Sequence, residues 1–386
     1  MSHAPSPALK RRHDAVRAAC ARAGVDALIV TTRSNILYLT NFTGSAAIAV
    51  VTADRVHFIT DFRYVTALDA MQQSAEACPD LQLTVVEGAY DSTLVTLLTA
   101  IGVSRVAFEA AHITVSRFKW LTATLARHTG APELVPLDDV VERLRVRKDE
   151  YELSMLREST RRLSAVANGV FSEVRRGRTE REVAQAIDSR LLAAGFERPA
   201  FDTIVASGPN AALPHAHPGE RKLGENEFVV LDFGGVYRSY CSDLTRTVFL
   251  GTASDRVREV YGAVLDAHDR AIRTAGPGRS RFAIDAAARD VLTSRGLGEA
   301  FGHGTGHGLG IDIHEDPKVT RQQGEATTAR DAQAEQDDAV DVGMVFTIEP
   351  GAYLPGWGGV RIEDDVLVTE HGVEVLTNVT TDLLEL

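Results

Sequence analysis

At residues 301–310 the chain reads FGHGTGHGLG, in which glycine occupies every second position. Successive side chains of a β-strand point to opposite faces, so one face of this stretch would be bare backbone. The other face would carry His303, Thr305, His307 and Leu309. Glycine inside a strand marks close approach of another backbone. The stretch therefore predicts a closely packed strand that presents polar side chains to a site.

This glycine-rich stretch does not match a nucleotide-binding loop, because it is neither a P-loop nor a strand-to-helix G-x-G-x-x-G. His303 and His307 are four residues apart, but the many glycines disfavour a zincin-type helix. His314 follows soon afterwards. A single histidine would more often be structural. Three histidines within twelve residues, on a glycine-rich frame, favour a functional role.

Two aspartates sit where buried strands should end. Asp232 follows the apolar residues 229–231, and a carboxylate there is costly unless it is paired or binds a cation. Taken alone, it would more often be a solvated strand end. Asp243 lies eleven residues further on, beyond a Gly-Gly pair suited to a turn. A hairpin would bring the two like charges together, which favours a divalent cation between them.

Two glutamates complete the set. Glu349 follows the apolar residues 344–348, and Glu363 shares a strand face with Arg361. Taken alone, Glu363 would be interpreted as an exposed residue paired with that arginine. Four carboxylates and the imidazole of His307 suit Mn, Co, Fe or Zn. Two ions that share bridging carboxylates would use all of these donors and generate a hydroxide nucleophile.

Composition limits the classes of partner and compartment. The chain has 386 residues and a net charge of -12, which disfavours nucleic acid as a partner. No stretch is apolar over a length that would span a membrane, and the N-terminus lacks a signal-peptide pattern. Three scattered cysteines argue against a disulfide framework and for a reducing compartment. We therefore expect a cytoplasmic protein.

The chain changes character near residues 137–148. Before this point helical and strand patterns alternate, which predicts a mixed α/β domain over residues 1–145. Beyond it, residues 146–386 become rich in strands interrupted by helices and are predicted to be α+β. The polar segment 318–342 has few large apolar residues and is expected to be a mobile surface loop.

Several motifs resemble the pita-bread metallopeptidases, which include Xaa-Pro aminopeptidase, prolidase and methionine aminopeptidase. The resemblance covers nearly the whole chain and is carried by LPHAHPG (213–219), VVLDFGGVYRSYCSDLTRT (229–247), GHGTGHGLGIDIHEDP (302–317), GMVFTIEPGAYLPG (343–356) and GVRIEDD (359–365). YLTNFTGS (38–45) and TDFRY (60–64) are similar to the creatinase-type N-terminal domain of the proline-specific members. The resemblance implies a creatinase-like α/β N-terminal domain followed by a pita-bread catalytic domain.

The resemblance also assigns the ligands of two metal ions. Asp232 would chelate one ion, and Asp243 and Glu363 would bridge both. His307 and Glu349 would hold the other ion. Glu349 would in addition pass a proton from the bridging water to the leaving amine.

Further roles follow from the same resemblance. His303 and His314 would position the substrate and stabilise the oxyanion as the carbonyl becomes tetrahedral. His215 matches a further active-site histidine of these enzymes, and we prefer it to the nearby His217. Arg361 would hold Glu363 and other acidic groups in place.

The chain departs from the family pattern at two places. Phe201 stands where relatives often have a tyrosine, so its hydroxyl must be absent or supplied elsewhere, with Tyr353 as one candidate. Prolidases carry an arginine that grips the substrate carboxylate, whereas residues 335–338 are acidic here. Arg321 or Arg330 could replace it, so the pattern leaves a dipeptidase and an aminopeptidase both open.

The resemblance thus implies hydrolysis of the bond between an N-terminal residue and proline, in Xaa-Pro dipeptides or short Xaa-Pro peptides, by a metal-bridging hydroxide. Two divalent ions are expected, manganese first and cobalt or zinc as alternatives, in at least a homodimer. The alternatives are a metal-free creatinase-like hydrolase, a methionine aminopeptidase-type enzyme and a non-catalytic binding protein. Metal-free and non-catalytic relatives usually lose ligands that this chain keeps.

Overall fold

The computed structural model describes residues 3–322 and 338–386 and divides into two compact units, Met1–Arg145 and Val146–Leu386. Most of the predicted loop 318–342 lies outside the described residues, as does Arg330. The two ends of that segment are described, and there the loop prediction was wrong because both belong to strands, β15 (Glu315–Val319) and β16 (Ala339–Val340). No helix within the described ranges is long and apolar enough to cross a membrane.

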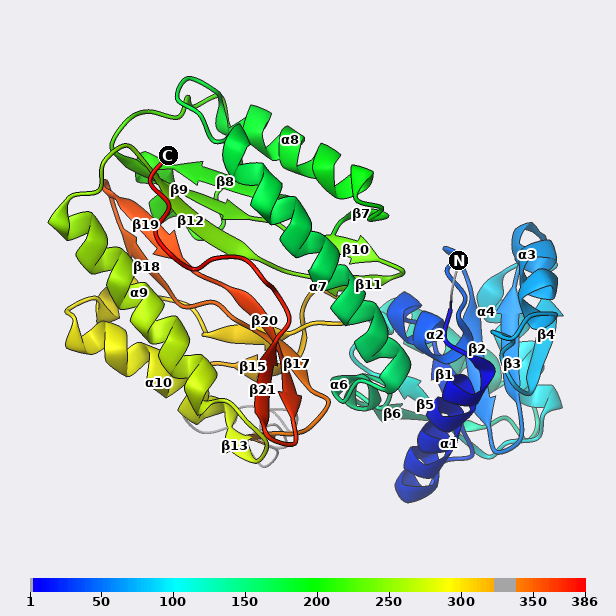
Figure 1. Cartoon of the computed structure of the whole chain (residues 1–386). Helices are drawn as coiled ribbons and strands as arrows, with labels where there is room; N and C mark the ends of the chain where they lie inside the picture. Colours follow the sequence, from blue (N-terminus) through cyan, green and yellow to red (C-terminus); the bar gives the residue numbers. More distant parts are fainter. Residues whose placement is uncertain (1–2, 323–337) are drawn as a thin grey trace. The chain divides into compact units, whose positions relative to one another are not determined.

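The first unit is an α/β domain around a six-stranded sheet of order β4-β3-β2-β1-β5-β6 (Figure 1). Its strands are β1 (Ala27–Val30), β2 (Ile48–Thr52), β3 (Val56–Thr60), β4 (Leu81–Val85), β5 (Arg105–Glu109) and β6 (Glu133–Leu137). Its helices are α1 (Ser6–Ala23), α2 (Arg33–Thr40), α3 (Phe62–Gln72), α4 (Tyr90–Ala100), α5 (Val115–Leu125) and α6 (Glu142–Val146). Helix α1 ends at Gly24, whose left-handed backbone closes the last turn.

The second unit combines four long helices with several small sheets, which confirms the predicted α+β class. The helices are α7 (Glu150–Val170), α8 (Glu180–Ala193), α9 (Asp255–Thr274) and α10 (Arg281–Ser294), with short 3-10 turns η1 (Phe171–Glu173), η2 (Gly208–Ala212) and η3 (Gly298–Ala300). The first strands are β7 (Arg198–Pro199), β8 (Ile204–Ser207), β9 (Glu227–Asp232), β10 (Gly235–Tyr237), β11 (Tyr240–Ser242), β12 (Thr245–Leu250) and β13 (Arg279–Ser280). The later strands besides β15 and β16 are β14 (Gly306–Gly308), β17 (Val345–Ile348), β18 (Gly351–Leu354), β19 (Gly358–Arg361), β20 (Asp364–Thr369) and β21 (Gly372–Val375).

Helices cover the sheets of this unit from both sides, and strand β9 shows why (Figure 1). Phe228 and Val230 join the apolar cluster under α9 and α10, whereas Val229 and Leu231 join the cluster under α7 and α8. Side chains alternate along a strand, so an unbroken apolar run feeds two cores at once.

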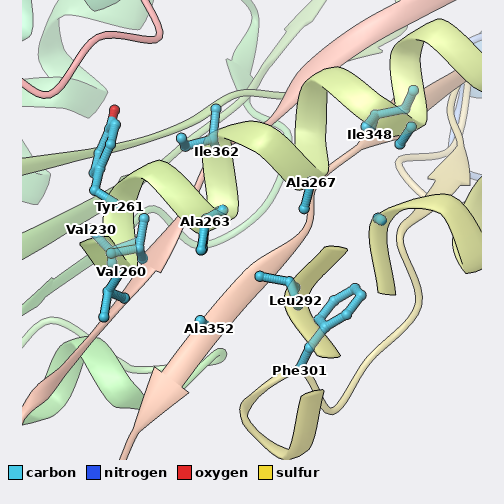
Figure 2. Close-up of a cluster of buried hydrophobic side chains, with 14 of the residues drawn as sticks. Val230, Val260, Tyr261, Ala263, Ala267, Leu292, Phe301, Ile348, Ala352 and Ile362 are labelled. Atoms are coloured by element: carbon cyan, nitrogen blue, oxygen red, sulfur yellow. The ribbon is translucent and has the colours of Figure 1, made fainter. Parts of the chain in front are cut away.

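Two glutamates follow directly after residues that are buried in the cluster under α9 and α10. Ile348 and Ile362 are fully buried in this cluster, together with residues such as Leu292 (Figure 2). The residue that follows each isoleucine is a glutamate, Glu349 or Glu363. Alternation of the extended chain turns these glutamates away from the apolar cluster. The two isoleucines therefore fix the direction in which the carboxylates point.

Residues 343–351 and 359–368 do not form two continuous strands, because each stretch is interrupted. The first divides into β17 and β18, with Glu349 between them, and the second into β19 and β20, with Glu363 between them. Strands β17 and β20 belong to a five-stranded sheet, whereas β18 and β19 pair with each other alone. The chain thus changes sheet at each glutamate.

Candidate metal centre

Four of the predicted ligands come together in the second unit. Asp243, His307 and Glu363 each offer a ligand atom, and these atoms lie within 4.8 Å of one another. His307 Nε2 lies 3.8 Å from Asp243 Oδ2 and 3.7 Å from Glu349 Oε1. These separations are too long for hydrogen bonds. They suit oxygen and nitrogen atoms that share a cation.

Asp232, the fifth predicted ligand, is the last residue of β9 and pairs with Thr245 at the start of β12. Its Oδ2 accepts a hydrogen bond of 2.5 Å from Arg361 Nη2. Its charge also contributes to raising the pKa of Asp243 and of Glu363, whose main cause is burial. Asp232 therefore faces the same centre, with one oxygen engaged by the arginine.

The carboxylates of this centre are buried and repel one another. Burial raises the pKa of Asp243 well above its usual range, and the charges of Asp232 and Asp365 raise it further. Burial and the charge of Asp243 raise the pKa of Glu363 in the same way. Asp243 Oδ1 is buried and has no hydrogen-bond partner within residues 3–322 and 338–386. A cation would relieve both the repulsion and the unpaired oxygen, so the residues fit a metal site.

His307 is held in the form that binds metals. Its Nδ1 lies 3.1 Å from the carbonyl oxygen of Gly308, so the Nδ1 proton is donated to the backbone and Nε2 is left with a lone pair. Burial lowers the pKa of His307, which keeps the ring neutral. The lone pair lies on the atom nearest to Asp243 and Glu349.

The glycines around His307 allow close approach of other backbone, as the sequence predicted. A Cβ atom on Gly306 would lie 1.8 Å from the carbonyl oxygen of Thr347, and one on Gly308 would lie 2.2 Å from that of Asp316. The predicted strand was too long, because only Gly306–Gly308 form β14 and the flanking residues are irregular. The backbone on either side of His307 is thus held by other backbone that can approach so closely only because residues 306 and 308 are glycine.

His303 has both ring nitrogens engaged. Its Nδ1 lies 2.7 Å from Gly304 O and must donate there, so Nε2 accepts the hydrogen bond of 2.8 Å from Tyr353 Oη. Tyr353 Oη in turn accepts from Arg361 Nη1 at 2.8 Å. The candidate replacement for the hydroxyl missing at Phe201 therefore lies in the same network as His303.

The other two predicted histidines lie beside this network. The ring of His314 is 4.3 Å from the ring of His307, measured between centroids. Burial lowers the pKa of His303 and of His314, and the charge of His215 adds to the effect in both cases. His314 therefore lies beside the ligand His307, and the charge of His215 acts on both His303 and His314.

Arg361 and Thr245 connect the ligands to one another. Arg361 donates to Asp232, to Tyr353 and, through Nε, to Thr245 Oγ1 at 3.1 Å. Thr245 Oγ1 donates to Glu363 Oε2 at 2.6 Å. The predicted link from Arg361 to Glu363 thus passes through a threonine that the sequence analysis missed. Its position two residues after Asp243, on the same face of an extended chain, was the available signal.

Asp365 is a second residue that the analysis missed. It is fully buried, and its Oδ2 accepts a hydrogen bond of 3.0 Å from the backbone N–H of Asp243. Burial raises the pKa of Asp365 well above its usual range. Asp365 follows Glu363 and Asp364 in sequence, and nothing in this acidic run distinguishes the residue that holds the backbone of Asp243.

Comparison with known proteins identifies related chains. The model of metallopeptidase family M24 matches residues 154–370, and that of the creatinase/prolidase N-terminal domain matches residues 12–147. The uncharacterised peptidase YqhT of Bacillus subtilis is 34% identical over 361 residues, which are 94% of this chain and 96% of that protein. A Xaa-Pro dipeptidase of Pyrococcus furiosus is 38% identical over 256 residues, which are 66% of this chain and 70% of that protein.

Solved structures with the same fold cover nearly the whole chain. A Xaa-Pro dipeptidase from Bacillus anthracis matches with a TM-score of 0.88 and 34% identity, covering 98% of this chain and 100% of the other. An X-Pro aminopeptidase from Thermotoga maritima matches with a TM-score of 0.83 and 30% identity, covering 97% of this chain and 100% of the other.

Proposed function

Because the chain belongs to metallopeptidase family M24, we propose that it hydrolyses the peptide bond between an N-terminal residue and proline. The observation that carries the proposal is the cluster of Asp243, His307, Glu349 and Glu363 beside Asp232. The similar proteins named Xaa-Pro dipeptidase and X-Pro aminopeptidase support proline as the second residue of the substrate.

We propose that the ligand set holds two divalent ions. Asp232 would bind one ion, His307 and Glu349 the other, and Asp243 and Glu363 would bridge them. A donor set of carboxylates with one imidazole favours manganese, with cobalt or zinc as alternatives. Two such ions, when bound, supply a hydroxide nucleophile at neutral pH.

The side chains around the ions would perform the remaining steps. Glu349, whose Oε1 lies 3.7 Å from His307 Nε2, would take up a proton and release it to the proline nitrogen as the bond breaks. His314 would donate a hydrogen bond to the developing oxyanion. His303, held between Gly304 and Tyr353, would shape the substrate site together with His215.

The remaining expectations are part of the same proposal. Residues 1–145 would be the creatinase-like N-terminal domain and residues 146–386 the catalytic domain. The substrates would be Xaa-Pro dipeptides or short Xaa-Pro peptides, and the protein would act in the cytoplasm as at least a homodimer. Light scattering of the purified protein tests the last point, since a monomeric mass contradicts it.

Alternative activities on this fold are less well supported. A metal-free creatinase-like hydrolase has no use for five clustered ligands, which this chain brings to one place. A methionine aminopeptidase-type enzyme is disfavoured because residues 12–147 match the creatinase/prolidase N-terminal domain.

The proposal is tested by peptide hydrolysis with and without metal. Chelator-treated protein should not cleave a Xaa-Pro dipeptide or a Xaa-Pro-Xaa tripeptide, and Mn²⁺ should restore cleavage of at least one of them. A Met-initiated peptide without proline serves as the control substrate. Full activity in chelator, or faster cleavage of the control substrate, would contradict the proposal.

A further inference from the structure

Arg246 is a buried arginine of β12 whose hydrogen bonds use its whole guanidinium group. It is 2% exposed. Its Nη1 donates to Thr245 O at 3.0 Å and to Glu363 O at 2.5 Å. Its Nε donates to Thr380 O at 2.8 Å, and its Nη2 donates to Val379 O and to Asp364 Oδ1, both at 2.8 Å. A guanidinium has five N–H donors, so five acceptors satisfy all of them.

Two of the five acceptors of Arg246, Thr245 O and Glu363 O, lie at or near the proposed bridging ligands. Thr245 is two residues from Asp243, and its hydroxyl donates to the Glu363 carboxylate. One nitrogen of Arg246 therefore joins the backbone of Thr245 to that of Glu363. In addition, Glu363 N donates to Thr245 O at 3.1 Å. These hydrogen bonds link the backbone of Thr245 to that of Glu363.

These hydrogen bonds join two segments that no sheet ladder connects. Asp243 leads into β12, which pairs with β9, whereas Glu363 lies between β19 and β20 of other sheets. The two segments share no sheet ladder, so their separation is set locally by the backbone hydrogen bond from Glu363 N to Thr245 O and by the side-chain hydrogen bonds of Thr245 and Arg246. Arg246 adds two hydrogen bonds to that connection, from its Nη1 to Thr245 O and to Glu363 O.

Asp364 keeps the guanidinium of Arg246 in place. It is 2% exposed, and its Oδ1 accepts from Arg246 Nη2 and from Thr377 Oγ1. Its Oδ2 lies 3.1 Å from Nε2 of His268, a buried residue of α9. The ion pair between Arg246 and Asp364 is thus buried, and truncating one partner would leave the other buried without an opposite charge.

We propose that Arg246 is a positioning residue of the metal centre, because it holds the backbones that carry Asp243 and Glu363 at the separation needed to bridge two ions. The inference rests on the proposed two-metal function. Because protein acceptors use all five of its N–H donors, Arg246 would act through the two ligands. Lysine keeps the charge but has only three donors and no planar fork, so Arg246→Lys leaves at least two of the five acceptors without a donor.

The test is a calorimetric titration of chelator-treated protein with Mn²⁺, which does not depend on any substrate. Loss of an outer hydrogen-bond partner typically weakens metal binding about 10- to 100-fold. Arg246→Lys is therefore expected to raise the Kd of Mn²⁺ by about 10- to 100-fold. Arg12→Lys is the matched control, because Arg12 is a buried arginine of the first unit that donates to Tyr38 O. This control should lower the Tm but leave the Kd of Mn²⁺ unchanged.

A second variant covers the case in which Arg246→Lys does not fold. Thr377→Val removes one hydrogen bond to Asp364 and leaves Arg246 intact, so it should weaken Mn²⁺ binding about two- to tenfold. Wild-type Mn²⁺ affinity in Arg246→Lys, or in Thr377→Val if the first variant is not folded, would overturn the inference. Equal weakening in Arg12→Lys would overturn it as well. A wild-type protein that binds none of Mn²⁺, Co²⁺ and Zn²⁺ would instead refute the proposed function itself.

Discussion

Replacing Thr245 with valine removes one hydroxyl and leaves the shape of the side chain nearly unchanged. Thr245 is fully buried, and its Oγ1 donates to Glu363 Oε2 at 2.6 Å while it accepts from Arg361 Nε at 3.1 Å. Both bonds involve a charged partner, and the loss of such a bond costs about 1.5–3 kcal/mol. In the variant, Glu363 loses a donor that fixes one of its oxygens.

The effect should be visible in catalysis. At about 1.4 kcal/mol per factor of ten, Thr245→Val should lower kcat/KM for a Xaa-Pro peptide about 10- to 150-fold. Thr245→Ser keeps the hydroxyl and should retain most of the activity. The assay is steady-state hydrolysis at saturating Mn²⁺, together with the Mn²⁺ affinity of each variant.

A matched threonine separates the effect on the site from a general loss of stability. Thr203 is also buried, and its hydroxyl donates to Asp188 Oδ1 at the same distance of 2.6 Å. Thr203→Val should lower the Tm but leave kcat/KM and Mn²⁺ affinity close to wild type. Wild-type activity in Thr245→Val, or an equal loss in Thr203→Val, would refute the reasoning.

Three other substitutions test the packing around the site. Gly306→Ala should lower the free energy of unfolding by about 3 kcal/mol or more, because its Cβ would lie 1.8 Å from Thr347 O; a wild-type melting curve would contradict this. Leu292→Ala opens a cavity in the cluster under α9 and α10 and should cost about 2–5 kcal/mol in denaturant unfolding, whereas a change below 1 kcal/mol, roughly an exposed-site value, would not fit. Glu180 accepts hydrogen bonds at both ends of the loop that carries His215. Glu180→Gln should therefore lower kcat/KM several-fold without changing Mn²⁺ affinity, and unchanged kinetics would argue against that role.

Helix α9 shows where the sequence was sufficient. Apolar residues recur at helical spacing over residues 255–274 and Ser254 caps the first turn, so the sequence pattern alone indicates this helix. The apolar run before Asp232 likewise forms the expected buried strand, β9. In both cases the local pattern and the tertiary packing favour the same structure.

Helices α2 and α3 show where local reasoning missed an element. Helix α2 has eight residues and no side-chain cap, so its sequence carries few helical signals. Helix α3 does have a cap, since Asp61 accepts from the backbone of Arg63, and this signal was overlooked. Both helices lie between strands whose apolar pattern is easier to recognise.

In the metal centre, too, the sequence predicts some residues and misses others. Asp232, Asp243, His307, Glu349 and Glu363 were predicted from residue type, apolar context and family resemblance, and the structure brings them to one place. Arg246 was not singled out, because an arginine in a strand is expected to be exposed. Its burial depends on acceptors about 120–135 residues away in sequence, which no local pattern reveals.

The central claim is best tested by a crystal structure of the Mn²⁺-loaded protein with anomalous diffraction measured for manganese. Two peaks about 3.5–4 Å apart, with Asp243 and Glu363 each contacting both and His307 contacting one, are the predicted result. A single peak, or none within reach of these side chains after loading, would contradict the proposed two-metal centre.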